Sequence, residues 1–244
     1  MNEATHEGGA HQRLERAAIA EPETRRSRAS VFQLYVLLAS AAFVALAAAA
    51  HYVPYFGIDL TITRVLQRYH APAFVGLMEG LSWLGFAPQC YLLAAGAILA
   101  LFLAGLRFEA IMAIVAGSAA LLGTGIKLLV RRPRPGADLV HVFWQLHTSG
   151  FPSGHVLMAT AFGGFLGFLA YTLLKPSWWR NAILGLIAAL ILLMAPSRIY
   201  LGHHWFSDTM GAYVLGSLWL ALTIRMYRHW KPRRLQDQPL AAEG

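Results

Sequence analysis

Long apolar runs are the feature of this sequence that most restricts its fold. The first, residues 31–53, contains no Asp, Glu, Lys or Arg. It is long enough to cross a bilayer core of about 30 Å as a helix that rises about 1.5 Å per residue. Hydrophobic residues make up 57% of the 244 residues and charged residues only 13%, whereas soluble domains are roughly one quarter charged. We therefore predict an integral membrane protein of the all-α class.

The apolar runs predict six transmembrane helices. The five that follow the first cover residues 89–106, 110–130, 154–174, 182–196 and 209–226. Glycines and alanines in the third, fourth and fifth would let helices approach closely, as membrane bundles require. For the first run a cleaved signal peptide is the alternative, because residues 47–50 are all alanine. The 30-residue polar leader and the length of the run favour an uncleaved anchor.

Residues 54–88 differ from the spans, because apolar side chains at helical spacing are interspersed there with charged ones such as Asp59, Arg64 and Glu79. This pattern predicts two amphipathic segments that lie along the outer membrane surface. A short, imperfect span through residues 73–87 is the alternative interpretation.

Basic residues predict the orientation of the chain. Residues 1–30 and 230–244 form polar tails around a membrane domain of residues 31–229, and six spans place both tails on one side. That side also holds the turns at 107–109 and 175–180 and most of the lysines and arginines. By the positive-inside rule it is the cytoplasm, which predicts a protein of the bacterial inner (plasma) membrane. We attribute the net charge of +8 to orientation and anionic lipids rather than to nucleic acid binding. The single cysteine, Cys90, excludes a disulfide framework and a thiolate metal site.

Three polar stretches lie at the predicted outer ends of the spans. The first, residues 127–135, ends the third span, where two prolines stop the helix and push Arg132 and Arg134 into extended conformations. Lys127 lies in the last helical turns and can extend its ammonium group to the same surface. A basic interfacial anchor is the alternative interpretation of these charges.

The second stretch, residues 150–155, opens the fourth span with the sequence Gly-Phe-Pro-Ser-Gly-His. A helix N-terminus offers free amides and a positive dipole end, and Gly154 would let an anion approach the main chain. Ser153 adds a hydroxyl donor, and His155 lies one step inside the helix. The alternative is a capped helix start with an interfacial histidine.

The third stretch, residues 197–208, links the last two spans. Charge in hydrocarbon costs about 2.5–3.5 kcal/mol or more per residue, so Arg198 and Asp208 need a reason to be there. If the sixth helix starts within this stretch, His204 and Asp208, four residues apart, share a face. A carboxylate bound to one imidazole nitrogen leaves the other free as nucleophile or base. His203 lacks this spacing and is interpreted as a bystander.

Taken in order, the three stretches form the patterns Lys-x6-Arg-Pro, Pro-Ser-Gly-His and Ser-Arg-x5-His-x3-Asp. Together they resemble the complete tripartite signature of the type 2 phosphatidic acid phosphatase and vanadium haloperoxidase superfamily. The resemblance covers roughly residues 85–226. The six-span arrangement is similar to the family's membrane-bound lipid phosphatases, whereas the haloperoxidases are soluble.

The resemblance implies a metal-independent lipid phosphatase without a cofactor. It implies that His204 attacks phosphorus and becomes a phosphohistidine, that Asp208 orients it, and that His155 is the general acid and then the base. The phosphoryl oxygens would be held by Lys127, Arg134, Ser153, Gly154 and Arg198. In keeping with this, the acidic residues on the outer side are scattered and too few for a two-metal site.

The substrate stays open at this stage. Phosphatidic acid, phosphatidylglycerol phosphate, undecaprenyl diphosphate and lipid A phosphates all present a phosphate at headgroup depth. Phe143 and Trp144 could shape lipid entry or could simply anchor the loop at the interface. A phosphotransferase that passes the phosphoryl group to an acceptor lipid is an alternative function, and a non-enzymatic anion or lipid transporter is another. The oligomeric state is not predicted.

Overall fold

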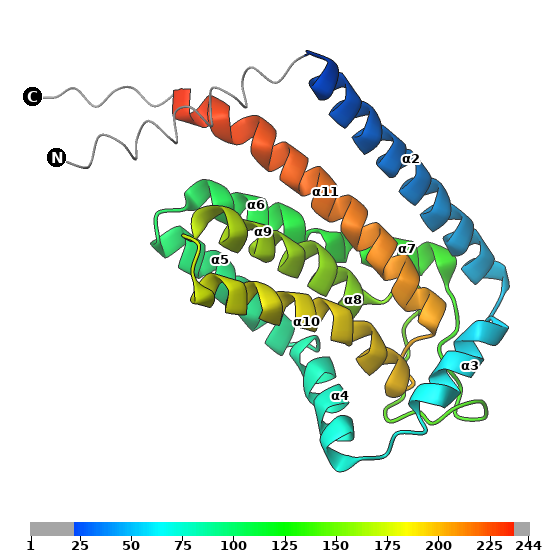
Figure 1. The fold of residues 1–244 in the computed structure, drawn as a ribbon. Helices are drawn as coiled ribbons and strands as arrows, with labels where there is room; N and C mark the ends of the chain where they lie inside the picture. The colour runs from blue at the N-terminus through cyan, green and yellow to red at the C-terminus, as the bar shows by residue number, and fades with distance from the viewer. Residues whose placement is uncertain (1–21, 237–244) are drawn as a thin grey trace, which may run out of the picture. The chain divides into compact units, whose positions relative to one another are not determined.

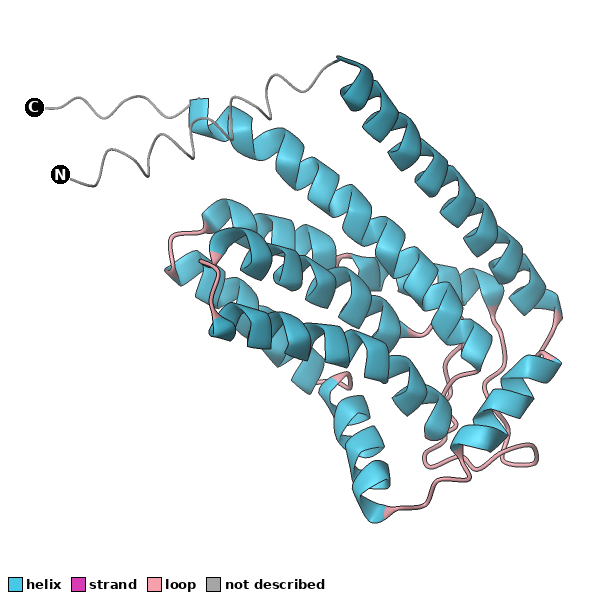
Figure 2. Cartoon of the chain, in the orientation of Figure 1, coloured by secondary structure: helices cyan, strands magenta, loops and turns pink. Residues whose placement is uncertain are grey.

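The computed structural model describes residues 22–236, and all regular structure in that range is helical, without strands (Figure 2). This confirms the all-α prediction. Residues 1–21 and 237–244, which belong to the predicted tails, lie outside the described residues. In chain order the elements are α2 (Pro22–Tyr52), α3 (Gly57–Leu66), α4 (Pro72–Leu84), α5 (Gln89–Leu103), α6 (Arg107–Gly117), α7 (Ala119–Val130), α8 (Gly154–Met158), the π-helical turn η1 (Ala159–Gly163), α9 (Gly164–Leu173), α10 (Trp178–Tyr200) and α11 (Phe206–Gln236).

The chain divides at Ala41 into two compact units. The described part of the first unit, residues 22–41, is one continuous helix. The second unit holds the rest of α2, the other helices and every predicted site residue.

Five helical segments are long and apolar enough to cross a membrane: Ala29–Tyr52, Arg107–Val130, Gly154–Leu173, Trp178–Tyr200 and Phe206–Lys231. The predicted span at 89–106 corresponds to α5, which has only 15 residues. It reaches spanning length only together with α4, to which it is joined through a 61° bend. By length and composition, the described residues therefore contain five candidate spans, or six if this bent pair crosses the membrane as one.

Two helix boundaries differ from the prediction in a way that matters for the site. The fifth span was expected to end at Pro196, but α10 continues through this proline to Tyr200. Buried packing of Ala195, Ile199 and Tyr200 offsets the one backbone hydrogen bond that a proline removes. The sixth span was expected to begin at residue 209, but α11 begins at Phe206. Arg198 is thus helical, and only a short turn separates the two spans.

Small residues lie where the spans cross, as predicted. A Cβ atom added to Gly123 of α7 would lie 2.6 Å from Leu157 Cδ2 of α8, and one added to Gly164 of α9 would lie 2.6 Å from Leu220 Cδ2 of α11. Such spacing leaves no room for a larger side chain. Many leucines point outward instead, including Leu103, Leu121, Leu129 and Leu186, which are 72–76% exposed; an apolar surface of this kind suits a lipid environment.

Helix α3 buries its polar side. Asp59 and Thr63 are fully buried, whereas Ile58 and Val65 are exposed. The helix is held against the long α7–α8 loop by hydrogen bonds from Arg64 Nη2 to Leu139 O at 3.2 Å and from Gln67 Nε2 to His141 O at 2.7 Å. The helix thus has a polar, buried side and an apolar, exposed side, and the predicted amphipathic segment along the outer membrane surface stays a prediction. The important result is that α3 carries a carboxylate into the interior.

One end of the helical bundle gathers the functional stretches (Figure 1). The end of α7, the start of α8, the last turn of α10 and the start of α11 meet there beside the α7–α8 loop. A core of Phe151, Val156, Leu157, Ala195 and Ala212 packs behind them. The site is therefore built on helix ends backed by packed side chains.

Candidate active site

His204 and Asp208 face each other as predicted, although they do not share a helical face. His204 precedes α11, and its Nδ1 lies 3.6 Å from Asp208 Oδ2. The same carboxylate oxygen accepts a 2.9 Å hydrogen bond from the Trp205 amide, which is an N3 side chain reaching back to the start of its helix. Asp208 thus fixes the beginning of α11 and faces His204 Nδ1, which has no hydrogen-bond partner among the described residues.

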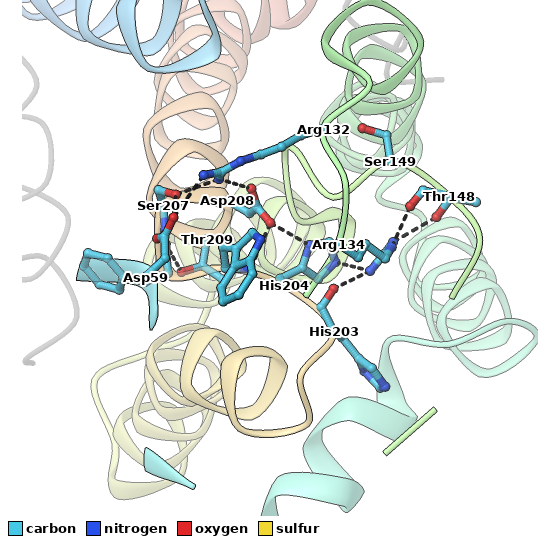
Figure 3. Close-up of polar contacts among 12 residues, drawn as sticks. Asp59, Arg132, Arg134, Thr148, Ser149, His203, His204, Ser207, Asp208 and Thr209 are labelled. Atoms are coloured by element: carbon cyan, nitrogen blue, oxygen red, sulfur yellow. Dashed lines mark hydrogen bonds and ion pairs between the residues drawn. The ribbon is translucent and has the colours of Figure 1, made fainter. Parts of the chain in front are cut away.

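Arg134 lies on the opposite side of the His204 ring (Figure 3). Its Nη1 is 3.2 Å from His204 Nε2 and donates to the His203 carbonyl at 2.6 Å. Two further hydrogen bonds, to Thr148 O at 2.7 Å and Thr148 Oγ1 at 2.8 Å, hold the guanidinium group in place. With Asp208 at Nδ1 and a cation at Nε2, the geometry favours the tautomer whose Nε2 lone pair points toward Arg134.

Lys127 lies in the last turn of α7, where its Nζ donates to Ser149 O at 2.8 Å. It lines a cavity of about 600 Å³ together with Arg131 and Arg134. Thr124 and Leu128 of α7 border the same cavity, and Leu128 is 68% exposed on the apolar face of the helix. The cavity therefore connects cationic groups with a surface that suits lipid.

The Pro-Ser-Gly-His stretch opens α8, with Ser153 at the N-cap and Gly154 as the first helical residue. Ser153 is fully buried, and its Oγ has no hydrogen-bond partner among the described residues. A Cβ at Gly154 would meet nothing within 4 Å, so there is open space above its backbone. The predicted anion contact at this helix start is sterically available.

His155 and Arg198 share a neighbour that sequence reasoning did not include, Phe86 in the turn between α4 and α5. The Phe86 ring lies edge-on to His155 with centroids 4.9 Å apart, and Arg198 Cζ lies 4.9 Å from its centroid. Arg198 is 1% exposed and donates a hydrogen bond to Ser82 Oγ of α4. The α4–α5 turn thus packs directly against two predicted site residues.

His203, interpreted from the sequence as a bystander, is buried at the site. It is 1% exposed, and neither ring nitrogen has a hydrogen-bond partner within residues 22–236. Its ring contacts Phe86 and Trp144, each at a centroid distance of 5.9 Å. With Arg134 and Trp144 it lines a second, smaller cavity of about 150 Å³ on the loop side. Only the fold, and no spacing in the sequence, identifies this position.

Burial and positive charge govern the protonation of both histidines. Burial lowers the pKa of His204 well below its usual value of 6.5, and the nearby charges of Arg134, Lys127 and Arg198 lower it further. Burial, with help from Arg198 and Arg134, lowers the pKa of His203 to about 3. Both rings are therefore neutral at neutral pH, and His204 lies within the electrostatic reach of the predicted phosphate-binding cations.

A second group of buried charges adjoins Asp208. Arg132 Nη1 lies 2.6 Å from Asp208 Oδ1, and its Nη2 lies 3.0 Å from Asp59 Oδ2 of α3. The sequence prediction had counted Asp59 among scattered outer carboxylates and had left Arg132 out of the site. The Arg-Pro-Arg-Pro sequence draws attention to Arg132. No local pattern in the sequence pairs it with Asp59, which lies more than seventy positions away.

The described residues contain no group of three or more His, Cys, Asp or Glu side chains arranged to hold a metal ion. The positive charges of Lys127, Arg134 and Arg198 all act on His204, and Lys127 and Arg134 line the larger cavity. This arrangement can bind a tetrahedral oxyanion through charge-assisted hydrogen bonds.

Comparison with known proteins agrees with this geometry. The family model described as the PAP2 superfamily matches residues 108–232, just over half of the chain. Phosphatidylglycerophosphatase B of Bacillus subtilis is 28% identical over 186 residues, which cover 72% of this chain and 86% of that protein. An undecaprenyl-diphosphatase of Sulfolobus acidocaldarius is 33% identical over 93 residues, or 38% of this chain and 40% of the relative.

Two crystal structures share the fold. A transmembrane PAP2-type phosphatidylglycerolphosphate phosphatase from Bacillus subtilis superposes with a TM-score of 0.68 at 24% identity, covering 80% of this chain and 97% of the other. Aquifex aeolicus LpxE superposes with a TM-score of 0.55 at 24% identity, covering 70% of this chain and 96% of the other.

Proposed function

Because the chain belongs to the PAP2 superfamily, we propose that it is a lipid phosphatase that hydrolyses a phosphomonoester or diphosphate through a phosphohistidine at His204. The observation that carries the proposal is the environment of the His204 ring, with Asp208 at Nδ1 and the Arg134 guanidinium 3.2 Å from Nε2. A neutral, oriented imidazole beside a phosphate-binding cation is the arrangement that attack on phosphorus requires.

In the proposed reaction, His204 Nε2 forms a bond to phosphorus while the bond to the leaving oxygen breaks. His155 gives its proton to that oxygen, which departs as the lipid alcohol or lipid phosphate. A water molecule then gives a proton to His155 and attacks phosphorus, the P–N bond breaks, and orthophosphate leaves. Asp208 stabilises the positive charge that His204 carries in between.

The phosphoryl oxygens are assigned to Lys127, Arg134, Arg198, the Ser153 hydroxyl and the amide near Gly154. The roles of Ser153 and of the amide near Gly154 have structural support, because Ser153 Oγ has no hydrogen-bond partner among the described residues and the space above Gly154 is open. Positioning and charge stabilisation supply most of the catalysis in phosphoryl transfer. These fixed cations therefore provide what other phosphatases obtain from metal ions.

The lipid is assigned to the larger cavity, which borders the exposed apolar face of α7. The relatives named above are phosphatases of phosphatidylglycerophosphate and undecaprenyl diphosphate, and these two lipids and phosphatidic acid are the first substrates to test. The distribution of basic residues supports a site that faces the outside of a bacterial inner membrane.

The test is phosphate release by the purified, detergent-solubilised protein across phosphatidic acid, phosphatidylglycerol phosphate, undecaprenyl diphosphate and lipid A phosphates, with EDTA present. We expect release from at least one lipid, and a loss of about a thousandfold or more in His204→Ala. Unchanged turnover in that variant would exclude the mechanism. Activity that EDTA abolishes and magnesium restores would contradict metal-independent catalysis.

A further inference from the structure

A closed set of buried charges lies behind the nucleophile, on the side of Asp208 away from His204. Arg132 is 1% exposed and Asp59 and Asp208 are 0% exposed. The guanidinium joins the two carboxylates, with Nη1 at 2.6 Å from Asp208 Oδ1 and Nη2 at 3.0 Å from Asp59 Oδ2 (Figure 3). Three separate parts of the chain meet here: α3, the loop after α7, and α11.

Hydrogen bonds hold both carboxylate oxygens of Asp59 in place. Its carboxylate accepts hydrogen bonds from the Phe56 amide at 2.9 Å, the Ser207 amide at 2.8 Å and the Ser207 hydroxyl at 2.8 Å. Arg132 Nη1 also donates to Ser207 Oγ at 2.7 Å, and its guanidinium lies over the Phe56 ring, 5.0 Å from the centroid. Neither charge can rotate away without breaking several buried hydrogen bonds, each worth about 1 kcal/mol or more.

The contact with Arg132 determines which carboxylate oxygen of Asp208 faces His204. Arg132 occupies Oδ1, so Oδ2 is the oxygen that receives the Trp205 amide and faces His204 Nδ1. A carboxylate held at both oxygens cannot rotate without breaking one of these hydrogen bonds. The orientation of the His204 ring therefore depends on a residue that it does not touch.

The balance of charge has a second effect. One guanidinium between two carboxylates leaves a net charge of −1, which offsets the positive charge that the His204 ring gains when it bonds to phosphorus. Because Asp59 takes part of the Arg132 charge, Asp208 is not fully neutralised and stays an effective partner for that ring.

We propose that Asp59 and Arg132 are positioning residues that set the orientation and the charge of Asp208, and through it the reactivity of His204. This inference rests on the proposed role of His204 as nucleophile. Asp59 comes from α3, which lies outside the 108–232 region matched by the family model, so the positioning residue is supplied by a segment that the matched region does not include.

The test compares Asp59→Asn and Arg132→Gln, with Asp138→Asn, an exposed carboxylate of the same loop, as control. Both test variants should lower kcat about 10- to 100-fold and leave KM within about twofold, because the phosphate-binding cations are untouched. The control should keep wild-type values. A fall in kcat confined to the two buried positions supports the inference, and unchanged kcat in both overturns it.

The pH profile separates positioning from simple damage. Loss of the Arg132 charge leaves Asp208 easier to protonate, so the acid limb of kcat should move to higher pH. When the Asp59 charge is lost, the full positive charge of Arg132 acts on Asp208. Asp208 is then harder to protonate, so the acid limb of kcat should move to lower pH. Shifts in opposite directions support the inference; shifts in one direction, or none, contradict it.

A double-mutant cycle completes the test. In an Asp208→Asn background, Asp59→Asn should change kcat by less than about twofold, since its effect passes through Asp208. A full, multiplicative loss would contradict the inference. If Asp59→Asn is not recovered folded, Ser207→Ala, which removes the hydroxyl between Arg132 and Asp59, should lower kcat in the same way and lose this effect in the Asp208→Asn background. If His204→Ala kept wild-type activity, that result would contradict the proposed function. It can therefore be told apart from a failure of the positioning inference, which concerns only Asp59 and Arg132.

Discussion

Gly85 shows how closely the α4–α5 turn approaches the site. A Cβ atom at this position would overlap the imidazole of His155, at its Cδ2 and neighbouring atoms. The backbone of Gly85, with φ of −95° and ψ of −3°, is open to any residue. The need for glycine here is therefore purely one of space beside a predicted catalytic group.

Gly85→Ala should consequently displace the His155 ring and lower kcat/KM by about a hundredfold or more, since an error of about 1 Å in catalytic geometry has an effect of that size. Gly80→Ala, within the helix α4 that Gly85 follows and with nothing within 4 Å of the added Cβ, is the matched control and should keep full activity. Equal activity of the two variants would place His155 outside the reacting centre.

The neutral histidines predict how stability depends on pH. The pKa of His203 is lowered to about 3 and that of His204 lies well below 6.5, whereas in the unfolded chain both titrate near 6.5. Between the two values only the unfolded state binds the proton, so stability falls as the pH drops below about 6.5. At pH 5 the His203 imidazole contributes a loss of about 2 kcal/mol, and the His204 imidazole acts in the same direction.

The melting temperature in detergent, measured at pH 7.5 and pH 5, checks this expectation. The melting temperature of the wild-type protein should fall more between pH 7.5 and pH 5 than the melting temperature of either His203→Gln or His204→Gln. A drop of the same size in all three proteins would show that these rings do not carry the effect.

Among single residues, the sequence was most informative where chemistry depends on local spacing. His204 and Asp208, or Ser153 to His155, could be recognised because the chain itself brings them within reach. Asp59, Phe86 and His203 could not, because their relation to the site arises only when α3 and the α4–α5 turn fold against distant helices. Buried pairs such as Asp59 and Arg132 have no local signature.

At the scale of elements, α6 and α11 are tied together at the ends remote from the site. Lys231 Nζ lies 2.6 Å from Glu109 Oε1 and 2.6 Å from Tyr227 Oη, and Tyr227 also donates to Glu109 at 3.0 Å. Glu109 and Tyr227 are buried, while the Lys231 side chain is 34% exposed. The cluster joins the beginning of one span to the end of another.

Glu109→Gln removes the charge and should destabilise the protein by about 1–2 kcal/mol, reduced from the value of a fully buried pair because Lys231 is partly solvated. Thermal unfolding in detergent should show a melting point several degrees lower, with kcat unchanged because the site lies at the other ends of these helices. Glu79→Gln on α4 is the control. A large fall in kcat at an unchanged melting point would contradict a purely structural role.

Helix existence was predictable from apolar runs, whereas helix ends were not. Pro196 looked like a terminus because proline removes a backbone donor, yet buried packing of Ile199 and Tyr200 carries α10 onward. The helices at 72–84 and 89–103 were assigned separately, and their 61° bend could not be read from composition. Tertiary packing decides both features, and it brings Arg198 into the interior.

For the whole molecule, the arrangement explains why a highly apolar protein keeps so many charges at one end of its bundle. The charges of Lys127, Arg134 and Arg198 act on His204, and Arg132 with two carboxylates lies on the far side of Asp208. The first group is suited to a ligand that brings negative charge, whereas the second keeps a net charge of −1 on the far side of Asp208.

The proposed phosphohistidine is the central claim, and trapping it is the most direct measurement. Protein mixed with a ³²P-labelled lipid phosphate and quenched in alkali, where phosphohistidine survives, should carry label on the peptide that contains His204. The label should be absent in His204→Ala and should persist longer in His155→Ala, which lacks the base for hydrolysis. Label on any other residue, or an active wild-type enzyme with no label under single-turnover conditions in either wild type or His155→Ala, would contradict the mechanism.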